Sequence, residues 1–202
     1  MTIMPEILPV LIKAVAASIE QNAEEVTALD QAIGDGDHVT NLQRGLDALL
    51  QQADDIALLQ WPAAIQKIGM TLLTTMGGAS GSLFGTLFIS MSKAMADKDE
   101  LNQKVLTEIF SQGVEAVKKR GKAEAGEKTM LDVLIPVAAK MVIGTDSEGI
   151  RQVAIEGMES TRDMKATKGR ASYLEEKSIG HIDAGARTSQ LMICAIVNEL
   201  EK

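Results

Sequence analysis

The segment from Asp30 to His38 has three aspartates within eight positions, at 30, 35 and 37, and two glycines, at 34 and 36. Glycine tolerates positive φ, so the backbone here can turn sharply enough to bring the carboxylates toward one point. Such carboxylates repel one another unless a cation lies between them. Their hard oxygen donors suit Mg²⁺, with water and phosphate oxygens completing the shell. Asp30, Asp35 and Asp37 are therefore predicted to bind magnesium beside a phosphate.

Two other interpretations fit a segment rich in Asp and Gly. Both residues are common in ordinary turns, and Asp37 could simply cap a helix that begins near Thr40. An EF-hand is a poorer match, because the chain continues through Asn41, Leu42 and Gln43 without the Glu that such a loop needs. The turn interpretation stays open on this segment alone.

A glycine segment, Gly77-Gly78-Ala79-Ser80-Gly81-Ser82, comes directly before an expected helix. Free N–H groups and the positive end of the helix dipole make such a helix start a cradle for phosphate oxygens. The signal is weak by itself, because glycine before a helix is common. Residues 121–129 superficially resemble a Walker A loop, but Glu127 is one residue too many and no strand precedes it, so we reject a P-loop.

The composition predicts one all-α domain over residues 1–202. Apolar residues make up 46% of the chain, enough for a sizeable core, and aromatic residues only 2%. Ala, Leu, Met, Glu, Lys and Gln are frequent, and they favour helices over strands. With a formal net charge of −8, the chain has no basic face to neutralise phosphates, so no nucleic-acid partner is expected.

Cysteine usage and hydropathy indicate a cytoplasmic protein with no membrane partner. Cys194 is the only cysteine, so no intrachain disulfide can form, and its apolar neighbours predict a buried, unreactive thiol. The N-terminus lacks a basic region followed by a cleavable apolar run. Residues 68–92 carry no charge, but the glycine segment in their middle predicts two buried helices in place of a membrane span.

Apolar residues recur at helical spacing along most of the chain, as at Leu8, Ile12, Val15 and Ile19. Eight helices with mostly short links predict an antiparallel bundle or closed barrel, and Pro136 predicts a kink in one of them. The expected helices cover residues 6–29, 40–52, 62–75, 82–95, 100–120, 129–143, 148–166 and 186–200.

The link 167–185, called the lid below, has no helical period. A loop that long inside a compact domain is usually functional, so we expect it to cover a ligand. If successive helices alternate in direction, the links after the first, third, fifth and seventh helices emerge at one rim. Those links contain the acidic segment, the glycine segment, residues 121–129, and Arg170, His181 and Asp183. The polar chemistry is predicted to gather there.

Four motifs, in order and over essentially the whole chain, resemble the ADP-binding subunits of phosphoenolpyruvate-dependent dihydroxyacetone kinases. They are also similar to the nucleotide domain of the ATP-dependent single-chain kinases. The motifs are Leu29-Asp30 with Ile33-Gly34-Asp35-Gly36-Asp37-His38, Gly77-Gly78-Ala79-Ser80-Gly81 with Leu83-Phe84-Gly85-Thr86, Arg120-Gly121-Lys122-Ala123 with Lys128-Thr129-Met130-Leu131-Asp132, and Gly169-Arg170-Ala171-Ser172-Tyr173-Leu174 with Gly180-His181.

The resemblance implies an eight-helix antiparallel barrel with ADP or ATP at one end. By matched position, Asp30, Asp35 and Asp37 would hold two Mg²⁺ ions that bridge the diphosphate. The remaining implied contacts are His38, Thr40, Asn41, Ala79 and Ser80 to the nucleotide, Gly121, Thr129 and Met130 along the base and sugar, and Arg170, Asp183 and Gly185 closing the pocket.

The resemblance also implies the activity. The bound nucleotide would be rephosphorylated in place by a phosphotransferase-system protein and would pass the phosphoryl group to dihydroxyacetone on a separate kinase subunit. A homodimer is a further expected assembly. A kinase subunit for another short-chain ketose, or a non-catalytic nucleotide-binding regulator, stays an alternative.

The chain departs from the family pattern at four positions. Val39 and Glu175 stand where glycine is usual, Lys177 where arginine is usual and Ala184 where proline is usual. Val39 is expected to disturb the acidic segment, because a β-branched residue resists positive φ.

Overall fold

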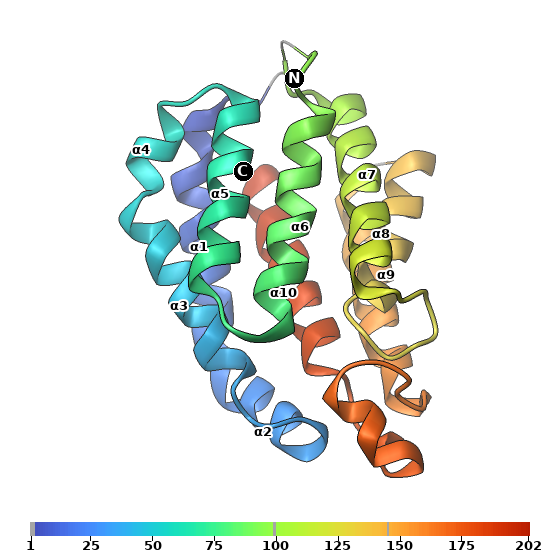
Figure 1. Cartoon of the computed structure of the whole chain (residues 1–202). Helices are drawn as coiled ribbons and strands as arrows, with labels where there is room; N and C mark the ends of the chain where they lie inside the picture. Colours follow the sequence, from blue (N-terminus) through green and yellow to red (C-terminus); the bar gives the residue numbers. More distant parts are fainter. Residues whose placement is uncertain (1–2, 99, 145) are drawn as a thin grey trace.

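The computed structural model describes residues 3–98, 100–144 and 146–202 (Figure 1). Within these ranges it is built from ten α-helices and three 3₁₀ helices, with no strand, which confirms the predicted all-α fold. The elements are η1 (Pro5–Ile7), α1 (Leu8–Gln21), α2 (Ala23–Ile33), α3 (His38–Gln51), α4 (Ala53–Ala57), α5 (Trp61–Thr75), α6 (Gly78–Ala94), α7 (Gln103–Gly121), α8 (Leu131–Ile143), α9 (Ser147–Ser160), η2 (Thr161–Asp163), η3 (Arg170–Ser178) and α10 (Ala184–Leu200).

The long helices close into a ring. The order of contact around it is α1, α3, α5, α6, α7, α8, α9 and α10, and α10 packs against α1 again. Successive helices of the ring alternate in direction, and α2, the α5–α6 link, the α7–α8 link and the lid all lie at its lower end in Figure 1. The barrel and the gathering of the polar links at one rim therefore follow the sequence prediction.

The ring forms because each helix buries an apolar stripe against its neighbours. Side chains such as Ile19, Val26, Ile109, Val117 and Val133 are fully buried inside it. Toward the other end, residues of α6, α7, α8 and α10 enclose an apolar cavity of about 400 Å³. Among the described residues, no helix has both the length and the hydropathy to cross a bilayer.

Several helix boundaries differ from those predicted. The expected helix 6–29 breaks at Asn22, whose side-chain amide donates to the Ser18 carbonyl at 2.7 Å and so competes with the helix. The helix expected from residue 82 begins at Gly78, so the glycine segment forms its first turn. The helix expected to reach residue 166 ends at Ser160. The short α4 was not predicted, and the lid contains η3.

Two of the four residues that depart from the family pattern, Val39 and Glu175, differ in their backbone conformation. Val39 lies buried in the first turn of α3 without positive φ, so the expected disturbance was wrong. Glu175 takes φ 49° and ψ −122°, a conformation that favours glycine. Cys194 is only half-buried, although burial raises the pKa of its thiol.

Candidate functional site

A cavity of about 380 Å³ opens at the end of the ring where the polar links meet. Most of the predicted site residues line it. They are Asp30, Asp35, Asp37, His38, Ala79, Ser80, Gly121, Thr129, Met130, Arg170, Asp183 and Gly185. Two predicted residues do not line the cavity: Thr40 is exposed on α3, and Asn41 is buried behind the glycine segment.

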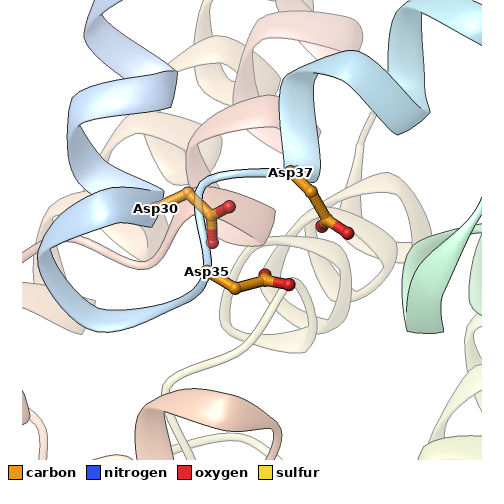
Figure 2. A group of neighbouring side chains, drawn as sticks. All are labelled: Asp30, Asp35 and Asp37. Carbon is orange, nitrogen blue, oxygen red and sulfur yellow. The ribbon is translucent and has the colours of Figure 1, made fainter.

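The three aspartates lie together, as Figure 2 shows. Asp30 comes from the last turn of α2, and Asp35 and Asp37 from the link to α3. One carboxylate oxygen from each lies within 4.8 Å of the others. The Asp37 side chain makes no capping hydrogen bond to α3, so the cap interpretation of this aspartate was wrong.

Glycine is required at the turn that forms this cluster. A Cβ at Gly34 would lie 2.1 Å from Asp30 Oδ1, so a side chain there would displace the first carboxylate. Gly36 has a φ of 77°. The other Asp30 oxygen accepts a hydrogen bond from the backbone N–H of His38 at 3.1 Å, which ties the two ends of the segment together.

The glycine segment lines the same cavity as the aspartates. The first N–H groups of α6 have no partner within the helix, as at any helix start, and Ala79 and Ser80 line the cavity there. A Cβ at Gly77 would lie 2.4 Å from the Asn41 side-chain oxygen. Asn41 therefore packs directly under the glycine segment, which indicates support for the cradle in place of the direct ligand contact predicted for it.

Cationic side chains line the cavity beside the aspartates and beside the glycine segment. The guanidinium of Arg170, at the start of η3 in the lid, forms an ion pair with the Asp35 carboxylate. Lys168 also lines the cavity. The basic end of α7 is more than a solvated helix end, because Arg120 lines the cavity and its Nε donates to Ser82 Oγ at 2.8 Å. Lys118, in contrast, pairs on the surface with Glu115 at 2.9 Å.

His38 is held from behind by α10. Its Nε2 lies 3.0 Å from the Thr188 hydroxyl, and Thr188 is fully buried. Burial lowers the pKa of the imidazole, although the nearby Asp30 and Asp37 oppose this effect. No pattern in the sequence pointed to Thr188, because a threonine one turn into a helix carries no mark of a partner 150 residues away.

Asp132 and Asp183 shape the segments around the cavity. The buried Asp132 carboxylate accepts hydrogen bonds from the backbone N–H groups of Gly126 and of Thr129, the latter at 2.7 Å. It shapes the α7–α8 link, and an aspartate three residues after Thr129 was a usable signal for that turn. Asp183 caps α10 by accepting from Ala186 N–H at 2.8 Å, and burial raises its pKa to about 6. His181 does not line the cavity.

The donor set fits a magnesium-bound phosphate. All three clustered side chains offer hard carboxylate oxygens, without sulfur or imidazole in the cluster, which suits Mg²⁺ over softer metals. A helix start and the Arg170 and Arg120 side chains lie around the same cavity and suit phosphate oxygens. A ligand that carries both a divalent cation and phosphates would pair the cation with the carboxylates and the phosphates with the helix start and the arginines.

Comparison with known proteins gives a consistent picture. The chain is 43% identical over 180 residues to the PEP-dependent dihydroxyacetone kinase 1, ADP-binding subunit DhaL, of Listeria innocua, which covers 89% of this chain and 88% of that protein. It is 40% identical over 179 residues to the Escherichia coli PEP-dependent dihydroxyacetone kinase, ADP-binding subunit DhaL, covering 85% of each.

A solved structure has the same fold. The dihydroxyacetone kinase from C. freundii, in complex with AMP-PNP and Mg²⁺, superposes with a TM-score of 0.78 at 21% identity over 98% of this chain. This chain spans 34% of that kinase. Residues 32–198 match the DAK2 domain. The chain belongs to the DAK2 domain family.

Proposed function

We propose that this chain is the nucleotide-binding subunit of a dihydroxyacetone kinase. It would hold ADP or ATP with two Mg²⁺ ions and relay a phosphoryl group from a phosphotransferase-system protein to dihydroxyacetone on a separate subunit. The observation that carries the proposal is the meeting of three carboxylates, within 4.8 Å of one another, with the start of α6 and a lid arginine around one cavity. The names of the two relatives support the acceptor and the subunit.

Each wall of the cavity has a part in this function. Asp30, Asp35 and Asp37 would hold the magnesium, which when bound neutralises charge on the phosphate oxygens. The backbone N–H groups of Ala79 and Ser80 would bind phosphate oxygens at the positive end of α6. Thr129 and Met130, just before α8, line the cavity and would contact the base and sugar. Arg170 would turn from Asp35 toward a phosphate when a nucleotide binds.

The scarcity of nucleophiles is consistent with phosphoryl transfer. This reaction depends mainly on positioning and on charge neutralisation, and it asks for little covalent chemistry from the protein. His38, whose imidazole is held by Thr188, would contact the ligand. The group that activates the acceptor hydroxyl would belong to the sugar-binding subunit, and the encounter would take place in the cytoplasm at the open end of the ring.

Native mass spectrometry with and without a magnesium chelator tests the site. We expect a mass excess of one ADP and two Mg²⁺ that is lost on chelation, and the same spectrum reports whether two copies associate. A transfer assay with the sugar-binding subunit, the phosphoryl donor protein and dihydroxyacetone tests the relay. A protein that binds its partner but never holds nucleotide or metal would refute the proposed function and favour a regulator.

A further inference from the structure

Lys128 is a lysine whose charged end is buried. The residue is 1% exposed, and its Nζ donates hydrogen bonds to the backbone carbonyl oxygens of Thr161 and His181. Thr161 lies where the chain leaves α9 toward the lid, and His181 lies where the lid returns toward α10. One ammonium group therefore joins the segment that leads into the lid, at Thr161, to the part of the lid that leads out of it, at His181; these two segments are called the lid ends below.

A buried ammonium is costly unless its donors are satisfied. In the described part of the chain, Lys128 has carbonyl partners but takes part in no ion pair of salt-bridge length; the carboxylates of Asp183 and Asp132 stabilise its charge from farther away. Its own φ is 62°, a conformation that side chains other than glycine rarely adopt. Both the burial of the charge and the backbone conformation cost free energy, which indicates that the position of this side chain matters to the protein.

Lys128 lies where the α7–α8 link meets the segment after α9 and the end of the lid. It belongs to the α7–α8 link, next to Thr129 and Met130, and lines the cavity itself. Uncharged hydrogen bonds also hold this junction, among them Gly180 N–H to the Arg162 carbonyl at 2.8 Å, Asp183 N–H to the Thr161 hydroxyl at 3.0 Å and Ala166 N–H to Ser178 Oγ at 2.9 Å. Only the Lys128 side chain reaches from the α7–α8 link to both ends of the lid in these contacts.

We propose that Lys128 is a positioning residue that holds the base of the lid closed and thereby sets how tightly the cavity retains its ligand. With the base held, Arg170 and Asp183 stay over the cavity. With the ammonium removed, both carbonyls lose a charged donor and the lid ends separate more often. The identity of the retained ligand, a magnesium nucleotide, rests on the proposed function, but the closure of the lid does not.

The test uses Lys128→Met, which keeps the length and apolar volume of the side chain but removes its donors. Lys165→Met is the matched control, because Lys165 also reaches the lid, through a surface ion pair with Glu176 at 2.8 Å. Hydrogen–deuterium exchange on metal-free and nucleotide-free protein should be about tenfold faster at residues 167–181 in Lys128→Met, with the ring helices unchanged. The control should exchange like the wild type.

Calorimetry with Mg²⁺ and ADP gives the second readout. We expect about tenfold weaker ADP binding for Lys128→Met and wild-type affinity for Lys165→Met. If Lys128→Met does not fold, Lys128→Arg takes its place, with a smaller effect of the same direction. Unchanged lid exchange, or unchanged affinity despite faster exchange, overturns the proposal. Failure of the wild type itself to bind Mg²⁺ and ADP refutes the proposed function instead. The exchange rates of the lid then still decide whether Lys128 holds its base closed.

Discussion

Asp183 should make the stability of the metal-free protein depend on pH. Burial raises the pKa of its carboxyl from 3.8 to about 6, although the Ala186 N–H and the Lys128 ammonium partly oppose the rise. Between these two pH values the folded chain keeps a proton that the unfolded chain has released. The free energy of unfolding therefore falls as the pH rises through this window and levels off above pH 6.

Asp183→Asn removes this titration and keeps the cap, because an asparagine oxygen can still accept from Ala186 N–H. The displaced pKa corresponds to about 3 kcal/mol at most between the two protonation states. Below pH 4 we expect variant and wild type to differ little. At pH 7 to 8 the variant should be more stable, by up to about 3 kcal/mol.

Urea unfolding at several pH values between 4 and 8, in the presence of a chelator, measures this difference. The single tryptophan, Trp61, is buried in α5 and gives a fluorescence signal, with circular dichroism as a second probe. A gain of about 3 kcal/mol would move the midpoint by about 1 M urea. A difference between the two proteins that stays constant across this range, or a variant that loses stability as the pH rises, would refute the reasoning.

Three further changes test other parts of the structure. Glu175→Gly should stabilise the protein by about 1 kcal/mol in thermal unfolding, because a residue at φ 49° and ψ −122° is strained unless it is glycine. A Glu175→Ala variant as stable as Glu175→Gly would contradict this. Gly81→Ala should destabilise it by about 2 kcal/mol in urea, since its Cβ would lie 2.4 Å from the Met76 carbonyl oxygen. Gly144→Ala, with nothing within 4 Å of the added Cβ, is the control and should change little. Asp37→Asn should weaken Mg²⁺-dependent ADP binding about tenfold in calorimetry without loss of stability, because this carboxylate makes no cap hydrogen bond; wild-type affinity would exclude Asp37 as a metal ligand.

The ring of helices could be predicted because its causes are local. Each stripe such as Leu8, Ile12, Val15 and Ile19 has a period that only a helix can bury on one side, and short links force neighbours to run antiparallel. The residues at which helices begin and end were harder to predict than the helices themselves. The break at Asn22 depends on a side-chain hydrogen bond competing with the helix, and no periodicity reports such competition.

The alternation of helix directions also predicted which links would meet. It brought Asp35 and Arg170 to one rim although 135 residues separate them in the chain. It could not say how each side chain would point. Asn41 lies behind the cradle and not in the cavity, because the backbone of Gly77 leaves room for its amide. That placement depends on the packing of α3 against α6, which the sequence of neither helix contains.

The burial of Lys128 could not be predicted from its residue type and its neighbours in the sequence. A lysine beside a glutamate in a glycine-rich link is ordinarily a solvated residue, since lysine is among the side chains least often buried. Here a φ of 62° and the two carbonyls at the lid ends keep the side chain inside. Those carbonyls belong to Thr161 and His181, 33 and 53 residues further along, so neither is visible as a partner in the sequence. A charged residue used to hold backbone segments together can be recognised only once the chain has folded around it.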